Sequence, residues 1–545
     1  MKSFFGIFDK IIAFCLLIAA IVVLAVSSVT TIYYDMHYDE DWPQYGRENI
    51  PLLVIFVLVT FAILIFLYRK GLFENCRAFG IAALLFITAY CLMLILSIHP
   101  QAVNDSKTLD DIINSFMEGD YSSLTEKGGY LFTWPYQLGY VFFGQIMYTL
   151  FGESNYFAWD ILQLLCILAT MFMIYRITRE LFENRAICGI TALLSCGALF
   201  FHNYVTYIYG DIISMAPQTL AIYMMILYVK RGKARYVIIS GVSIAVAILL
   251  KTNCEIALIA LLMVLVGSAF DGRAGRPIKK LAQRAALAAT FLLLVWGSKS
   301  AINAYYCNVT GIESIPEGSP SWSHIAMGMQ ESLLEDGWYN GYNYHVFAEN
   351  GYDTKATAAA ARENIKETLT DFAHRPLHAC RFFLRKFTTQ WADSVCISTH
   401  NLDLVSRHVE NQPALCDFLV FGTGSQILIW IMNIYMPVCY LGVVGYLINI
   451  LFGGRRHHGA SGATCGSTVS ADNSASGSTA SAGRHTPSHE EMLLLILIFG
   501  GIVFHEFWEG SSRYTMRYYI YYLPYAGFGI YRILSFIDGK LGQKK

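Results

Sequence analysis

The chain has 545 residues, of which 55% are hydrophobic and 14% are charged, and 39 basic and 40 acidic side chains give a net charge of −1. Soluble proteins carry about 25% charged residues. The apolar residues come in long blocks, which excludes a soluble enzyme and an outer-membrane barrel. The balanced charge gives no indication of a nucleic-acid partner. We therefore expect an all-α polytopic membrane protein.

The apolar blocks can be compared in chain order with the length of about 20 residues that a spanning helix needs. This criterion predicts twelve spans. They are residues 11–33, 50–68, 78–98, 156–175, 186–208, 212–229, 236–251, 255–270, 285–306, 426–451, 491–508 and 518–536. A further apolar segment, 136–151, is shorter, and we expect it to lie along the outer membrane surface.

Basic residues between the spans predict the orientation, because short cytoplasmic loops are enriched in Lys and Arg. Four basic clusters must then lie inside: Arg69–Arg77, Arg176–Arg185, Lys230–Arg235 and Arg273–Arg284. They share one side only if 136–151 does not cross. The pattern predicts a multi-pass integral membrane protein with both termini in the cytoplasm.

Three longer polar segments separate the spans. Residues 99–155 and 307–425 are expected outside, and the second is long enough to form a small domain. Residues 453–490 are expected inside and are rich in Gly, Ser, Ala and Thr, which predicts a disordered linker. The expected divisions are two N-terminal spans (1–77), a transmembrane core (78–306), the outer segment (307–425) and the C-terminal spans with the linker (426–545).

The thirteen cysteines form no CxxC pair, and no histidine cluster has metal-ligand spacing. The sequence therefore predicts neither a metal site nor a disulfide framework. Four cysteines share the outer segment: Cys307, Cys380, Cys396 and Cys416. They either pair in an oxidising space or remain four free thiols.

The first outer segment contains the most specific pattern. Asn104 or Asp105 can cap a helix whose apolar residues recur at helical spacing, and Gly119 can end it. The result is a one-sided helix close to the end of the third span. A second surface helix is expected to begin at Trp134-Pro135-Tyr136-Gln137.

This arrangement resembles the GT-C membrane glycosyltransferases, in particular the branch that contains protein O-mannosyltransferases and aminoarabinose transferases. Its members carry an acidic residue just beyond a spanning helix, in a first outer segment with two juxtamembrane helices. The matching residues here are Asp105, Gly119-Asp120-Tyr121 and Trp134-Pro135-Tyr136-Gln137. The resemblance extends over about 78–306 and the last two spans.

The resemblance implies an inverting glycosyltransferase that moves a sugar from a polyprenyl-phosphate donor to an acceptor on the outer face. A phosphate leaves without much protonation, so the reaction mainly needs a base for the proton of the acceptor hydroxyl. We assign this role to Asp105. The alternative is that Asp105 is an ordinary helix cap or a solvated acid. Asp211, in an outer turn, is a second candidate catalytic residue, because relatives often carry an acid there. The alternative is that outer turns favour polar residues.

The leaving phosphate needs cations on the same face. The resemblance places Arg513 and Tyr514 at the outer end of the last two spans, and a guanidinium suits phosphate because it offers paired donors and a permanent charge. Lys127, Tyr136 and Gln137 complete the candidate donor-binding set. The alternatives are a membrane anchor for Arg513 and a solvated loop lysine for Lys127. No cofactor and no metal are expected.

The main alternative function is a transporter or lipid flippase, and a third is a non-catalytic subunit of an envelope-building complex. A transporter should carry ionisable residues near mid-membrane. Asp160 and Lys299 are the few candidates, whereas the polar residues gather outside. The expected partners are a polyprenyl-phosphate sugar, membrane lipids and an acceptor glycan, lipid or protein. A glycan on the sequon at Asn104 would obstruct the site, which favours a bacterial cytoplasmic membrane.

Overall fold

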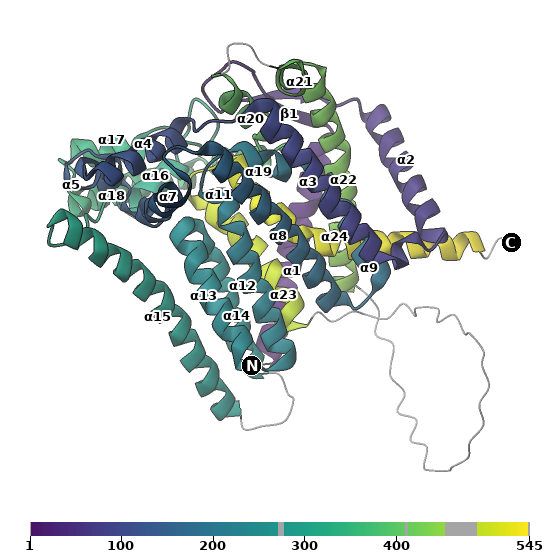
Figure 1. Cartoon of the computed structure of the whole chain (residues 1–545). Helices are drawn as coiled ribbons and strands as arrows, with labels where there is room; N and C mark the ends of the chain where they lie inside the picture. Colours follow the sequence, from purple (N-terminus) through teal and green to yellow (C-terminus); the bar gives the residue numbers. More distant parts are fainter. Residues whose placement is uncertain (1, 271–276, 409–412, 453–487, 543–545) are drawn as a thin grey trace.

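The computed structural model describes the chain except for residues 1, 271–276, 409–412, 453–487 and 543–545. Helices form a bundle, from one side of which the long helix α15 leans outward (Figure 1). The prediction of an α-helical polytopic protein is confirmed. The predicted linker at 453–490 falls almost wholly outside the described residues.

Every segment predicted to span the membrane is largely helical. The helices are α1 (Lys2–Ser27), α2 (Ile50–Arg69), α3 (Cys76–Ile98), α8 (Tyr156–Phe182), α9 (Arg185–Gly197) with α10 (Leu199–His202), α11 (Gly210–Ile213) with α12 (Met215–Arg231), α13 (Ala234–Leu250), α14 (Glu255–Gly267), α15 (Pro277–Thr310), α22 (Thr423–Phe452), α23 (His489–Phe507) and α24 (Ser512–Gly542). Within the described residues, eight helices are long and apolar enough to cross a membrane, or nine with the bent α9–α10 pair. The count of twelve membrane spans stays a prediction.

The first predicted span, 11–33, is wrong at its C-terminal end. The helix α1 ends at Ser27, and the chain then forms the antiparallel strands β1 (Thr30–Tyr34) and β2 (Pro43–Arg47). The strand residues are mostly β-branched or aromatic, which suits a pleated surface better than a helix. These strands and their connection, residues 30–47, are called the N-terminal hairpin below, and they depart from the all-α prediction.

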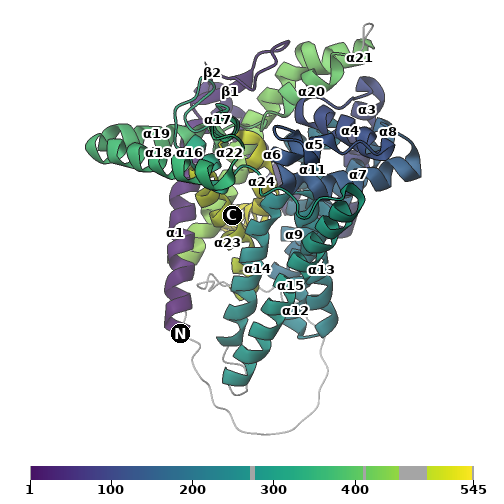
Figure 2. The same ribbon diagram turned by 90° about the vertical axis from the view of Figure 1, so that its left-hand side faces the viewer.

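One end of the bundle carries the hairpin and most of the shorter helices, and we call it the hairpin end (Figures 1 and 2). The shorter helices are α4 (Asn104–Glu118), α5 (Ser122–Thr125), α6 (Tyr130–Thr133), α7 (Leu138–Phe151), α16 (Ser321–Gly328), α17 (Tyr342–Glu349), α18 (Thr354–His374), α19 (Pro376–Trp391), α20 (Ser398–Ser406) and α21 (Ala414–Cys416).

Helix α4 follows its sequence pattern closely. Its apolar face is buried, and Gly119 ends it in the left-handed conformation with a φ of 87°. The residue before the helix, Val103, donates its N–H to Ser106 Oγ at 2.9 Å. Neither Asn104 nor Asp105 is therefore the cap, and Asp105 remains exposed in the first turn. The interpretation of Asp105 as a helix cap is wrong.

Segment 307–425 is attached to the bundle through a buried lysine. Lys386 of α19 donates to the carbonyl oxygens of Glu506 at 3.1 Å and Trp508 at 2.7 Å. These carbonyls belong to the end of α23 and the turn that follows it. A buried ammonium group needs such partners because an unpaired charge is costly away from water. The contact holds α19 beside the start of α24.

Two glycines allow α22 and α24 to approach closely. A Cβ built on Gly529 would overlap the carbonyl oxygen of Gly442, whereas a Cβ on Gly539 of the same helix meets nothing within 4 Å. Because the obstacle is backbone, rotation of a side chain cannot relieve the overlap. The two helices are therefore held at a distance that only small residues permit.

We expect Gly529→Ala to lower the free energy of unfolding by about 1–3 kcal/mol, because the added methyl group must push α22 and α24 apart. Thermal unfolding of the detergent-solubilised protein measures the effect. Gly539→Ala is the matched control and should be neutral or slightly stabilising, because alanine favours the helix. Equal melting temperatures for both variants would contradict the packing described here.

Candidate functional site

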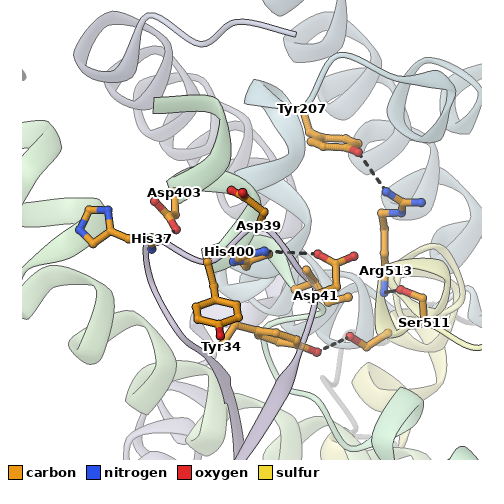
Figure 3. Close-up of polar contacts among 12 residues, drawn as sticks. Tyr34, His37, Asp39, Asp41, Tyr207, His400, Asp403, Ser511 and Arg513 are labelled. Atoms are coloured by element: carbon orange, nitrogen blue, oxygen red, sulfur yellow. Dashed lines mark hydrogen bonds and ion pairs between the residues drawn. The ribbon is translucent and has the colours of Figure 1, made fainter. Parts of the chain in front are cut away.

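Arg513 lies in the first turn of α24, and its guanidinium group points to the hydroxyl group of Tyr207 (Figure 3). Its Nη1 donates to the hydroxyl of Tyr207 at 3.0 Å, and its Cζ lies 5.3–5.8 Å from the ring centroids of Tyr207, Tyr209 and Tyr514. Its Nε is buried without a hydrogen-bond partner. Within the described residues, no carboxylate forms an ion pair with it. The guanidinium therefore keeps donor capacity and charge for an anion.

Tyr514 is held by an acid that precedes it by five residues. Its hydroxyl group donates to Glu509 Oε1 at 3.0 Å, and Glu509 lies just before α24. Burial raises the pKa of the Glu509 carboxyl group, although the nearby Arg513 opposes this shift. The predicted residues Arg513 and Tyr514 thus form one contiguous group of side chains.

Asp211 is buried beneath this group and is already paired. Its Oδ2 lies 3.2 Å from Lys251 Nζ, and its Oδ1 lies 4.0 Å from Arg517 Nη2. Arg517 also donates to Ser214 Oγ at 3.1 Å, and its side chain is only 2% exposed. A carboxylate enclosed by two cations is poorly placed to take a proton from a substrate. This arrangement favours a positioning role for Asp211 over the direct catalytic role expected from the sequence.

Charges of both signs lie near Arg513. Lys251 and Arg517 are two further cations, and both are paired with Asp211. Glu509 and Asp41 interact electrostatically with Arg513, but neither forms an ion pair with it in the described part of the chain. Lys251 also lies over the ring of Tyr209, with its Nζ 4.1 Å from the ring centroid. Fixed cations in partly dry surroundings interact with an anion more strongly than they would in water.

Asp105 belongs to the same end of the molecule and the same group of side chains. It is close enough to interact electrostatically with Tyr207 and Tyr209, the two tyrosines that also contact Arg513. It also interacts with Glu509. The exposed carboxylate and the guanidinium therefore act electrostatically on the same two tyrosines.

The remaining predicted residues divide into two groups. Gln137 is buried and donates from Nε2 to the hydroxyl of Tyr209 at 2.6 Å, and Tyr136 is half exposed and interacts electrostatically with Asp105. Lys127 is exposed and donates to the carbonyl of Gly351 in segment 307–425 at 3.2 Å. This contact favours the interpretation of Lys127 as an ordinary loop residue.

The structure adds residues that the sequence analysis did not assign to the site. Tyr207, Tyr209 and Lys251 are neighbours of Arg513 or Asp211 through tertiary contacts. Asp41, from the connection of the N-terminal hairpin, lies near Arg513 and 3.5 Å from Nε2 of His400 (Figure 3). In the sequence, the one feature that could have indicated these residues was Lys251, because it is a lone lysine at the end of an apolar span.

The described residues contain no group of three His, Cys, Asp or Glu side chains that could hold a metal ion. Cys307, Cys380 and Cys396 of segment 307–425 are free thiols in the structure. For these three, the structure shows the second of the two arrangements that the sequence left open.

Residues 138–296 match the model of the dolichyl-phosphate-mannose-protein mannosyltransferase family. They lie inside the region predicted to resemble membrane glycosyltransferases, and the resemblance is confirmed there. The match includes Asp211 and Lys251 but neither Asp105 nor Arg513. The crystal structure of apo ArnT from Cupriavidus metallidurans aligns over 83% of this chain and 75% of that chain, with 11% identity and a TM-score of 0.29, which does not establish a common fold. No curated protein matches the chain.

Asp211→Asn should destabilise the protein by about 3–5 kcal/mol, because it leaves Lys251 and Arg517 without their buried counter-charge. Thermal unfolding in detergent measures the loss. Adding Lys251→Met to Asp211→Asn should recover part of the stability, since one unpaired cation is removed. A fully stable Asp211→Asn variant would show that the carboxylate does not hold these cations.

Proposed function

We propose that the protein is an inverting glycosyltransferase that moves a sugar from a polyprenyl-phosphate donor to an acceptor at the outer face of a membrane. The observation that carries this proposal is the guanidinium of Arg513, which has no carboxylate partner among the described residues and shares its tyrosine neighbours with the exposed Asp105. An anion site and a carboxylate base are the two groups that such a transfer needs.

Arg513 would bind the donor phosphate, with the positive charge of Lys251 beneath it. The anomeric carbon would then lie above these cations. As the bond from this carbon to the phosphate oxygen breaks, negative charge grows on the leaving polyprenyl phosphate. Fixed cations stabilise that charge without having to reorganise. The lipid tail would enter sideways from the bilayer.

Asp105 would act as the general base. Its carboxylate accepts the proton of an acceptor hydroxyl group as the hydroxyl oxygen attacks the anomeric carbon from the face opposite the phosphate. The new glycosidic bond forms as the bond to the phosphate breaks, so the configuration inverts. The exposed position of Asp105 in the first turn of α4 leaves the carboxylate open to an incoming acceptor.

Asp211, Gln137 and Tyr514 would act by positioning. Asp211 holds Lys251, Gln137 donates to Tyr209, and Tyr514 lies against Arg513. Because these side chains are themselves fixed by neighbours, Arg513 and Lys251 would keep their positions in the absence of the donor. The hairpin end would then face outward, with both termini in the cytoplasm and a bacterial cytoplasmic membrane as the expected location.

Lys299, one of the two residues that suggested a transporter, does not fit a transport path, whereas the other, Asp160, is buried in the bundle. Lys299 forms an ion pair with Glu255 at 2.6 Å, and both side chains are more than 40% exposed on the bundle surface. A lysine that serves a transport path should instead face the bundle interior or a water-filled cavity.

We expect Asp105→Asn to lower turnover by about 10²–10⁴-fold, because the amide cannot take the acceptor proton. The assay follows the release of polyprenyl phosphate from a panel of polyprenyl-phosphate sugars by the purified protein in the presence of membrane extract. Asp111→Asn is the matched control, since Asp111 is an exposed acid on the same helix. Equal release by the wild type and Asp105→Asn would remove Asp105 from the mechanism.

Arg513→Gln should weaken donor binding by about 10–100-fold, the range expected when a charged hydrogen bond is lost. Arg513→Lys keeps the charge without the paired donors, and its affinity for the donor should lie between those of the wild type and Arg513→Gln. Binding of polyprenyl phosphate itself, measured by displacement of a fluorescent analogue, separates this effect from chemistry. Unchanged affinity in Arg513→Gln would place the phosphate elsewhere.

A further inference from the structure

The N-terminal hairpin is fastened to the turn that carries Arg513. The hydroxyl of Tyr34, at the end of β1, lies 3.0 Å from both Asp393 Oδ2 and Ser512 Oγ, and Ser512 directly precedes Arg513. Asp393 is buried and also accepts the backbone N–H groups of Val395 and Ile397 at 2.9 Å. Tyr34 therefore joins the hairpin to segment 307–425 and to α24 at one point.

A second set of contacts holds the connection between the strands, residues 35–42. The backbone N–H of His37 donates to Asp403 Oδ2 at 2.7 Å, and the ring of His37 stacks on Phe421 with centroids 4.7 Å apart. Arg407 bridges Asp403 and Asp39, with Nη1 2.5 Å from Asp39 Oδ1. The connection is thus held at His37 and at Asp39, two residues before Asp41 (Figure 3).

Asp41 is the acid of this connection that faces Arg513. Its side chain is 33% exposed, lies 3.5 Å from Nε2 of His400, and interacts electrostatically with Arg513 and Tyr207. His400 is fully buried, and neither of its ring nitrogens makes a hydrogen bond within the described part of the chain. A buried imidazole directed at a part-exposed carboxylate suits the positioning of that carboxylate for a ligand.

Two exposed aromatic residues belong to the same connection as Asp41. Trp42, the following residue, is 47% exposed, and Tyr38 is 50% exposed and meets Trp42 edge to face at 6.5 Å. Aromatic rings can stack on the apolar face of a sugar, and a carboxylate can accept hydrogen bonds from its hydroxyl groups. The chemistry of the connection therefore suits a carbohydrate.

We propose that Asp41, with Trp42 and Tyr38 beside it, binds a carbohydrate acceptor and that His400 positions the Asp41 carboxylate. This inference rests on the proposed function, in which the donor phosphate occupies Arg513. Asp41 and Asp105 both act electrostatically on Tyr207, so an acceptor held by Asp41 would lie at the same end of the molecule as the base. The hairpin belongs to the hairpin end, where a water-soluble acceptor arrives, whereas the lipid-linked donor enters from the bilayer (Figure 2). The hairpin between the two N-terminal spans thereby becomes part of the enzyme's acceptor site.

The test is saturation-transfer NMR of the full-length protein in nanodiscs with a panel of short neutral oligosaccharides built from hexoses and N-acetylhexosamines. We expect the wild type to bind at least one of them and Asp41→Asn to bind it at least 10-fold more weakly. Asp35→Asn is the matched control, because Asp35 is an exposed acid of the same connection, and it should bind within 2-fold of the wild type. His400→Gln should weaken binding less than Asp41→Asn.

Absence of any bound oligosaccharide, or equal binding by Asp41→Asn and the wild type, overturns the proposal. If Asp41→Asn does not fold, Trp42→Ala tests the same surface, and unchanged binding by that variant overturns it as well. Polyprenyl-phosphate binding is measured in parallel and should be at least as strong in Asp41→Asn as in the wild type, because the variant loses a negative charge near Arg513. Its absence in the wild type would refute the proposed donor site, whereas oligosaccharide binding would still report on Asp41.

Discussion

The candidate site depends on one buried electrostatic arrangement, in which Asp211 holds the side chains of Lys251 and Arg517 below a layer of tyrosines. Buried cations are costly unless they are paired, and here one carboxylate serves two of them. Arg513 lies near this pair, and its tyrosine neighbours leave its Nε without a hydrogen-bond partner. A permanent charge with a free donor in partly dry surroundings suits the binding of a phosphate.

The start of α24 is the point at which distant parts of the chain meet. Tyr34 of the N-terminal hairpin contacts Ser512, Lys386 of segment 307–425 donates to Trp508, and Tyr207 from between α10 and α11 accepts from Arg513. Each contact joins a different region to the same turn. A site assembled in this way is rigid because no single element can move without breaking buried polar contacts.

Local sequence patterns were sufficient to predict a structure that depends on a single helix or strand. Helix α4 is amphipathic and ends at a glycine, and both features are local. The end of the first span was wrong because the residues from Thr30 to Tyr34 are apolar enough to extend a span but form a strand once paired with 43–47. Hydropathy alone does not distinguish a buried strand from the last turns of a spanning helix.

The site itself was only partly predictable. The resemblance identified Asp105, Asp211 and Arg513 as candidates, but the number of cations around Asp211 depends on packing among α11, α13 and α24. Asp41 is one of several acids in a short polar stretch, and no spacing distinguishes it from Asp39.

By itself the sequence determined the helical membrane class, the one-sided helix α4 and the family resemblance, since these follow from composition, periodicity and short motifs. Tertiary structure decided that Asp211 is enclosed by cations while Asp105 stays exposed, and that Asp41 lies near Arg513. Burial and charge pairing arise between residues hundreds of positions apart, and no local pattern encodes them.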